Sequence, residues 1–177
     1  TSDFLDDFKT NLYSDEIYVF TPKGDLFTLP KNATALDFAF SVHTDVGVSC
    51  IGAKVNSKLV PLSYVLKSGD QIEILTSKKQ IPKEAWLDFV ITSKAKSKIK
   101  QTLKEEKKKL AINGKEILER KLNALKLNFS ESNLKIILKH YHFKEHTEFF
   151  FQIAQGTVDL SKIKEINHKS GQLYISS

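Results

Sequence analysis

The chain has 177 residues, of which 41% are hydrophobic and twelve are Phe, and its formal net charge is +6. This length allows one domain or two small ones. The absence of an apolar run of about 18 residues excludes a membrane-spanning helix, and the acidic start has no signal-peptide shape. The single cysteine, Cys50, excludes an internal disulfide and fits a reducing, cytoplasmic compartment. The positive charge favours an anionic partner such as nucleic acid.

The first half of the chain predicts a small sheet. Apolar residues at helical spacing predict a lead-in helix over residues 1–15, after which the pattern alternates as in a strand. Pro22 and Gly24 predict a hairpin turn. Asn56 and Ser57 predict a second tight turn, and because Ser suits it less well than Gly, we expect strain or a looser turn there. The strands are predicted over residues 17–20, 26–29, 51–55, 58–62 and 71–75.

One short helix interrupts these strands. Thr34 precedes an apolar-rich run and Asp37 follows three residues later, which is a capping-box-like start. The helical pattern stops near His43, and Gly47 then indicates a loop that leads into the next strand. A hairpin, a helix, a second hairpin and a last strand within about sixty residues describe a β-grasp, ubiquitin-like domain over residues 16–79.

His43 sits where the predicted helix ends and the loop opens. A side chain there is held by the scaffold and can still reach a partner. From the local pattern alone, a histidine that caps the helix end and suits its dipole explains the position as well. Cys50 is interpreted as a small buried hydrophobe rather than a reactive thiol.

Residues 80–177 predict a small all-α domain of short helices. Pro82 suits the first position of a helix, Gly114 is expected to break one, Ser130 to cap one and Gly156 to stop one. Within this region, Lys96, Lys100 and Lys104 share one helix face at i, i+4 spacing. Two interpretations stay open, since that face is either simply solvated or in contact with phosphates.

Catalytic and metal chemistry finds little support in the sequence. The three histidines of HYHFKEH lack zinc-ligand spacing and no cysteine accompanies them, so we expect no metal and no cofactor. There is no Walker A loop, GxGxxG, GxSxG or HExxH motif. We therefore expect that the chain is not itself an enzyme.

Three segments in order resemble one family. They are VFTPKGDLFTLP, ALDFAFSVHTDVG and CIGAKVNSKLVPLSYVLKSGDQIEILTS, followed by the basic WLDFVITSKAKSKIKQ. This order is similar to the TGS domain, and the start of the helical domain after it, of the long RelA/SpoT homologues, which make and hydrolyse (p)ppGpp in the stringent response. The resemblance implies a regulatory piece of a longer protein, without the hydrolase and synthetase domains that precede TGS in that family.

The resemblance also implies a partner. In ribosome-bound members, TGS meets the 3′ CCA end of uncharged tRNA, and the motif histidine matches His43, with Thr44, Gly52 and Lys54 expected to shape the pocket. An imidazole can stack on an unpaired base and hydrogen-bond to its edge. Many members carry a basic or polar pair after the VG of this motif, where this chain has Val48 and Ser49, which lowers the local positive charge.

Two alternatives remain. In SpoT-like members TGS is thought to bind acyl carrier protein, which is acidic and would suit the same basic surface. Alternatively, the piece would mainly transmit strain between the parent protein's own N-terminal catalytic domains and its ribosome-binding parts. No membrane partner is expected in either case.

Overall fold

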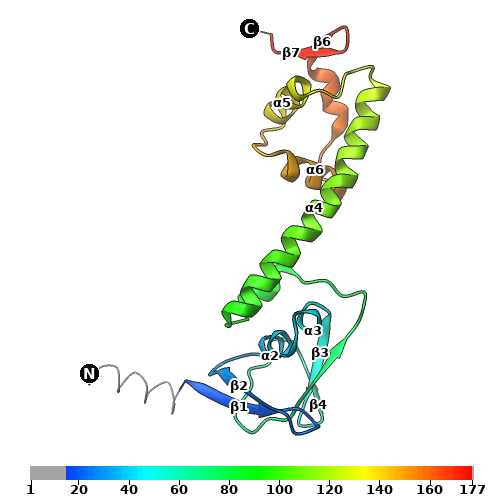
Figure 1. Ribbon diagram of the computed structural model, residues 1–177. Helices are drawn as coiled ribbons and strands as arrows, with labels where there is room; N and C mark the ends of the chain where they lie inside the picture. The colour runs from blue at the N-terminus through cyan, green and yellow to red at the C-terminus, as the bar shows by residue number, and fades with distance from the viewer. Residues whose placement is uncertain (1–14, 177) are drawn as a thin grey trace, which may run out of the picture. The chain divides into compact units, whose positions relative to one another are not determined.

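The computed structural model describes residues 15–176, and the contacts divide the chain into two compact units, Thr1–Leu103 (unit 1) and Lys104–Ser177 (unit 2). Strands dominate the first half and helices the second (Figure 1), which confirms the α+β class predicted from the sequence. Except for Asp15, the lead-in helix predicted over residues 1–15 lies outside the described residues.

The first hairpin of unit 1 pairs β1 (Glu16–Phe20) with β2 (Leu26–Pro30) in antiparallel register, with Ile17 opposite Leu29. Gly24 has a φ of 93°, a conformation that glycine adopts without steric cost. The turn closes when the Thr21 N–H donates to the Asp25 carbonyl at 3.0 Å. The hairpin predicted around Pro22 and Gly24 is thereby confirmed.

A second sheet has the order β4-β3-β5, built from β3 (Cys50–Val55), β4 (Lys58–Val60) and β5 (Ile72–Thr76). The turn between β3 and β4 is tight, and both of its residues have positive φ, 52° at Asn56 and 70° at Ser57. Twisted hairpins prefer this turn geometry. The expected strain is present, since Ser57 is held in a conformation that suits glycine.

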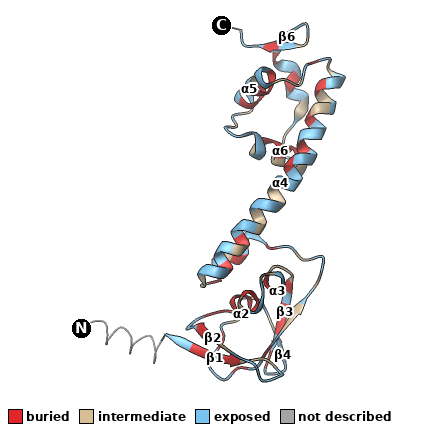
Figure 2. Cartoon of the chain, in the orientation of Figure 1, coloured by how far each residue is buried: buried red, intermediate tan, exposed pale blue. Residues whose placement is uncertain are grey.

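A short parallel contact links the two sheets, because the Phe20 N–H donates to the Asp70 carbonyl at 3.0 Å and Phe20 bridges Gln71. Helix α2 (Ala35–Val42) packs its Phe38 in one core with Val19, Ala53 and Ile72 from the strands. Six of the eight residues of α2 are buried, all except the last two (Figure 2). The capping box predicted for Thr34 and Asp37 is present.

The loop predicted after His43 is wrong in part, because residues Thr44–Val48 form a second short helix, α3. Two local features explain the error. The His43 side chain caps α3 by accepting from the Asp45 N–H. Gly47, which indicated a loop, is needed for packing: a Cβ there would lie 2.4 Å from the ring of Phe40.

The packing of unit 1 continues beyond its last strand. The helix predicted from Pro82 is a 3-10 turn, η1 (Glu84–Asp88), before the long helix α4 (Ser93–Ala124) begins. Trp86, Val90 and Ile99 share a core with Leu36, Phe40 and Cys50. The compact unit defined by contacts extends to Leu103, and the domain boundary expected at residue 79 stays a prediction.

The helix break predicted at Gly114 is wrong, because α4 runs through it for a total of 32 residues. A Cβ at Gly114 would lie 1.7 Å from the Phe150 carbonyl oxygen. The glycine therefore permits a close crossing of α4 and α6 (His146–Gln155), and its lower helix propensity, about 1 kcal/mol, is offset by that packing.

Unit 2 completes its core with α5 (Glu131–His140), the 3-10 segment η2 (Leu160–Glu165) and a hairpin of β6 (Asn167–Lys169) and β7 (Gln172–Tyr174). The sequence predicted only helices here, and the hairpin corrects that. Its Leu173 is buried with the helical residues Leu118, Ile137 and Phe149.

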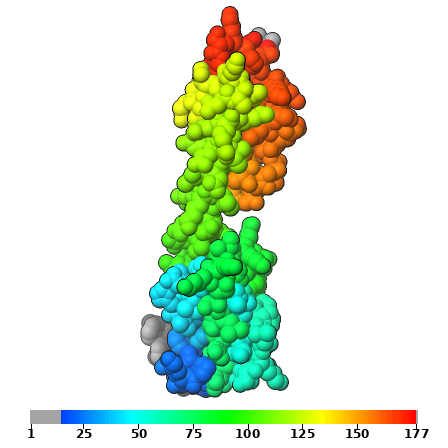
Figure 3. All heavy atoms as spheres, turned by 90° about the vertical axis from the view of Figure 1, so that its right-hand side faces the viewer, coloured from blue at the N-terminus to red at the C-terminus, as the bar shows by residue number. Residues whose placement is uncertain are grey.

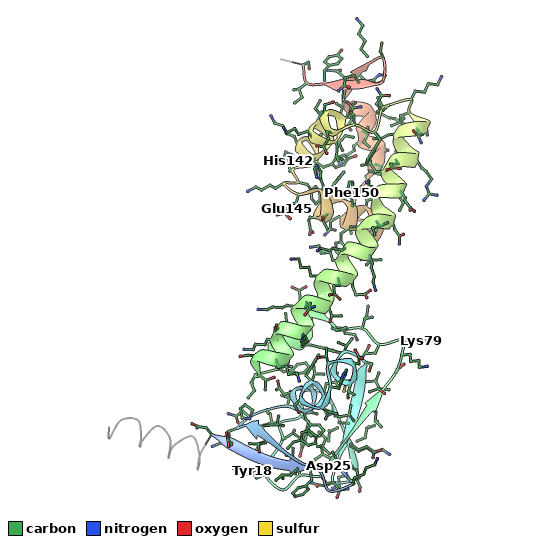
Figure 4. All side chains as sticks on the ribbon, in the orientation of Figure 1. Tyr18, Asp25, Lys79, His142, Glu145 and Phe150 are labelled. Carbon is green, nitrogen blue, oxygen red and sulfur yellow. The ribbon has the colours of Figure 1, made fainter. Side chains whose placement is uncertain are left out.

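The helices of unit 2 end in a common way. Gly156 closes α6 in the left-handed conformation, as predicted, with the Thr157 N–H bonded to the Gln152 carbonyl. Lys126 and His142 close α4 and α5 in the same manner, with φ of 59° and 64°. This is the Schellman arrangement, which usually takes glycine. It gives His142 (labelled in Figure 4) a structural place at a helix end.

Candidate functional site

His43 joins α2 to α3 and its backbone is held on both sides. Its N–H donates to the Ala39 carbonyl at 3.3 Å, and its carbonyl accepts from the Gly47 N–H at 3.1 Å. It is at once the last cap of α2 and the first cap of α3. The position of its Cα is therefore set by two helices, although the residue itself is exposed.

The imidazole of His43 is oriented by one hydrogen bond. Its Nδ1 accepts from the Asp45 N–H at 3.0 Å, which requires a lone pair on Nδ1 and leaves the proton of the neutral ring on Nε2. The side chain is 64% exposed. The ring therefore offers solvent a flat face and an N–H donor, and its rotation is limited by the cap.

Thr44 follows His43 as the first residue of α3, while Gly52 and Lys54 lie on β3. Side chains alternate along a strand, and since Ala53 and Val55 face the core with Phe38, Lys54 belongs to the outer face of the sheet. Gly52 is buried and lies at an irregularity in the register of β3 with β5. No hydrogen bond within residues 15–176 joins either of them to His43 or Thr44. Their role in one pocket stays a prediction.

The outer face of this sheet is open. Lys54 pairs in register with Leu59 of β4 and Glu73 of β5, and Leu59 is 72% exposed. Residues coloured cyan to green form much of the surface of unit 1 in Figure 3. Gly52 itself is buried, although a Cβ added there would have no heavy atom nearer than 3.9 Å.

Lys96, Lys100 and Lys104 all lie on α4 and are exposed. Among residues 15–176, none of the three forms an ion pair; the lysines that do so are Lys107 and Lys109. A free ammonium on a helix surface can contact phosphate or simply be solvated. Both interpretations of this lysine face remain open.

The sequence predicted Asp37 only as part of a helix cap, but its side chain also bonds to a distant segment. Its side chain is buried, and its Oδ2 accepts from the N–H and the hydroxyl of Thr34, both at 2.9 Å. The same carboxylate also accepts from the N–H groups of Ile91 and Thr92 and from the Thr92 hydroxyl. Thr92 in turn caps α4 through the Ala95 N–H. One carboxylate thus ties the starts of two helices together.

The described part of the chain shows no reactive cysteine, no metal-binding cluster and no membrane-spanning helix. Cys50 is fully buried, and its burial raises the pKa of the thiol to about 11, against a small lowering by its contact with the Gly52 carbonyl. Residues 15–176 contain no cluster of three His, Cys, Asp or Glu that could hold a metal ion. In the same range, no helix has both the length and the apolar character needed to cross a bilayer.

Two family models match the chain. Residues 17–76, which contain helices α2 and α3 and, apart from Glu16, the strands of unit 1, match the TGS domain. Residues 102–165, from α4 to η2, match the RelA/SpoT AH domain. Neither match contains Ile91 and Thr92, the two partners of Asp37 that are distant in sequence, because both lie in the segment between the matches.

Curated relatives agree with these models. The chain is 46% identical over 129 residues to a GTP pyrophosphokinase of Myxococcus xanthus. It is 48% identical over 163 residues to a guanosine-3′,5′-bis(diphosphate) 3′-pyrophosphohydrolase of Aquifex aeolicus, and 38% identical over 168 residues to a GTP pyrophosphokinase of Escherichia coli. These matches cover 72%, 92% and 92% of the chain but only 17%, 23% and 22% of the relatives. The chain therefore carries the TGS and AH domains of the RelA/SpoT family and is homologous to a part of its (p)ppGpp synthetases and hydrolases.

Proposed function

We propose that the TGS part of this chain contacts the 3′ CCA end of uncharged tRNA on the ribosome and that His43 is the recognition residue. In this proposal the chain regulates catalytic domains of a (p)ppGpp synthetase or hydrolase and has no turnover of its own. The observation that carries it is the exposed His43 ring, whose backbone and Nδ1 are both held by helix caps.

A restrained ring suits an unpaired base. Because the cap already limits the rotation of His43, little side-chain entropy is lost when a base stacks on it. The proton on Nε2 gives a donor for a base edge, so stacking and edge recognition come from the same side chain. Ribosomal A-site binding and discrimination of a free terminal hydroxyl are part of the proposal and rest on the family.

The exposed lysines of α4 support the same proposal. Lys96, Lys100 and Lys104 are free to approach phosphates, and each phosphate contact adds to the salt dependence of binding. Replacement of all three by Gln should weaken RNA binding and flatten its salt slope. An unchanged slope would assign these side chains to a solvated face.

The test compares three substitutions of His43 in the full-length parent enzyme. His43→Ala removes both the ring and the cap, whereas His43→Asn keeps an acceptor for the Asp45 N–H and His43→Phe keeps a ring. Loss of one stacking partner costs on the order of 1–3 kcal/mol. Ribosome-dependent stimulation by deacylated tRNA should therefore need about tenfold more tRNA with Ala or Asn, and less of an increase with Phe.

A purely structural role of His43 predicts a different ranking of the three variants. Asn would then be well tolerated because it restores the cap, and both Ala and Phe would lower the melting temperature. Stimulation that persists in all three variants with normal dependence on deacylated tRNA would refute the proposal. A parallel pull-down with acyl carrier protein tests the alternative partner of SpoT-like members.

Transmission within the protein is a second candidate, favoured by one specific observation. Helix α2 carries His43 at its C-terminal end and Asp37, bonded to the start of α4, at its N-terminal end. A force on His43 would reach α4 through eight residues of rigid helix. Stimulation lost in Asp37→Asn while tRNA binding is kept would support this role.

A further inference from the structure

The parallel pairing of strand β1 with strand β5 reaches only the start of β5, and the sequence explains why it ends there. The contact of β1 with the segment that leads into β5 includes the bond from the Gly69 N–H to the Tyr18 carbonyl at 2.8 Å and, next, the bond from the Phe20 N–H to the Asp70 carbonyl at 3.0 Å. In a parallel ladder the next donor on the same strand lies two residues on, at Pro22, and would serve the Ile72 carbonyl. Proline has no N–H, so the ladder cannot continue past this point.

The rest of β5 therefore has one free edge. Glu73 and Leu75 pair with β3 on one side, and because backbone groups alternate in direction along a strand, the Ile74 N–H and carbonyl face the other side. Among residues 15–176, the only strand contact of β5 on that side is the bridge between Phe20 and Gln71. An unpaired edge of this kind is a template for another extended chain.

A groove lies beside this free edge. It has a volume of about 410 Å³ and is lined by Ile72 and Ile74 of β5 and by Phe38, Val42 and Val46 of the two helices. Its size falls in the range of about 300–1,000 Å³ typical of ligand sites. Val42 is 41% exposed, whereas Phe38 and Ile72 are fully buried, so the groove has an exposed apolar wall beside a closely packed apolar base.

The mouth of the groove carries charges of both signs. Lys23 and Asp25 come from the β1–β2 turn and Glu73 from β5; Figure 4 labels Asp25 at that turn. One cation beside two carboxylates is a poor match for a phosphate backbone, which needs a surplus of positive charge. The apolar base and the mixed rim instead suit an uncharged apolar side chain.

We propose that the β5 edge and this groove form a docking site for an extended segment of a partner protein, which adds to β5 as a strand. Backbone hydrogen bonds to the Ile72 carbonyl and to Ile74 supply the affinity, and a branched apolar side chain of the segment fills the groove between Val42 and Val46. This is the strand-addition mode of peptide recognition, in which alternate side chains give specificity. The site is independent of His43 and of the tRNA proposal.

The test starts from a displayed library of random heptapeptides selected on the full chain. We expect enriched peptides to carry an apolar branched residue flanked by uncharged or mixed residues. A synthetic copy of an enriched peptide should protect the Ile74 amide from hydrogen exchange. It should bind at least tenfold more weakly to Val42→Lys, which places a charge at the groove, but equally to Leu59→Lys, which alters an exposed apolar side chain outside it.

A backbone control separates strand addition from simple apolar binding. N-methylation of the peptide at the amides that face β5 should abolish binding, and N-methylation at the alternate amides should leave it unchanged. Absence of any enriched peptide, equal binding by both N-methylated forms, or equal binding to Val42→Lys would each overturn the proposal. Saturable shifts of the Val42 and Val46 methyl signals with a CCA trinucleotide would assign the groove to RNA and would also overturn it.

Discussion

Each unit has a buried polar residue in the first turn of a helix that bonds to a distant part of the chain, but the residue is an aspartate in unit 1 and an asparagine in unit 2. In unit 1, Asp37 is the third residue of α2, and its N–H donates to the side chain of the cap Thr34. In unit 2, Asn133 is the third residue of α5, and its N–H donates to the side chain of the cap Ser130. Both side chains are buried, and both reach from a helix start to a later segment of the chain.

The partners decide which side chain is used. Asp37 meets only donors, namely N–H and hydroxyl groups of Thr34, Ile91 and Thr92. Asn133 meets both kinds, since its Nδ2 donates to the carbonyls of Asn128 and Gly171 and its Oδ1 accepts from the Leu173 N–H.

A carboxylate accepts only, and the N-termini of two helices also stabilise its negative charge. An amide suits a site with mixed partners. The comparison teaches that a buried polar position is specified by the backbone groups around it, because an unmatched donor or acceptor there costs about 1–3 kcal/mol.

Asn133→Asp breaks the comparison most strongly. The new carboxylate would face the carbonyls of Asn128 and Gly171, which it cannot bond, and an uncompensated buried charge costs about 3–5 kcal/mol. Urea unfolding of unit 2, followed by far-ultraviolet circular dichroism at pH 7, should shift by that amount. Asn113→Asp, on an exposed position of α4, is the control and should change little. Equal shifts in the two variants would contradict the role given to Asn133.

Gly114→Ala tests the close crossing in unit 2. Its Cβ would collide with the Phe150 carbonyl (Phe150 is labelled in Figure 4), and since the obstacle is backbone, the helices must separate. Overpacking of this kind costs about 1–3 kcal/mol, and we expect the upper end of that range because backbone cannot move aside easily. Trp86, the only tryptophan, is buried in unit 1, so its fluorescence transition should stay in place while the helical signal melts earlier. The neighbouring Asn113→Ala should be neutral, and a stabilised Gly114→Ala would show that no such crossing exists.

Asp37→Asn sharpens the comparison from the other side. The amide keeps the shape but presents an NH2 group to donors, so at least one hydrogen bond to Ile91 or Thr92 is lost. We expect a loss of about 2 kcal/mol, detected by Trp86 fluorescence in urea. Asp88→Asn, at an exposed carboxylate of the same unit, is the matched control. Unchanged stability of Asp37→Asn would mean that the starts of the two helices are held by apolar packing alone.

The smallest effect concerns an ion pair at the surface of unit 2. Glu148 accepts from Gln152 and pairs with Lys107, and these two contacts lower the pKa of its carboxyl below 4.5. A lowered pKa stabilises the folded state above pH 4.5, and the stabilisation is lost as the pH falls through the folded value. Both side chains are more than one third exposed, so screening limits the effect of Lys107→Gln to about 0.5 kcal/mol at pH 7. The difference from the wild type should shrink as the pH falls below 4.5 and the carboxyl becomes protonated, and a difference that does not change with pH would contradict an ionic origin.

Local signals were sufficient for much of the fold. The order of the strands, the caps at Thr34 and Ser130 and the stop at Gly156 follow from residues within a few positions of each other, and all are observed. The candidate site was found in part for the same reason. His43 stands out as a helix-end residue from sequence alone, and the family resemblance that pointed to its role rests on neighbouring motifs.

Contacts between distant residues decided the rest. By propensity, Gly114 predicts a helix break and Gly47 predicts a loop. In the structure, a Cβ at Gly114 would overlap the Phe150 backbone, and a Cβ at Gly47 would overlap the Phe40 ring. Packing therefore explains both glycines. The bonds from Asp37 to Ile91 and Thr92 span more than fifty residues. The groove beside β5 is lined by both Pro22 and Ile72, which lie fifty residues apart in the sequence. Sequence patterns record how a residue suits its own helix or strand, whereas these features depend on which backbone groups the folded chain places opposite it.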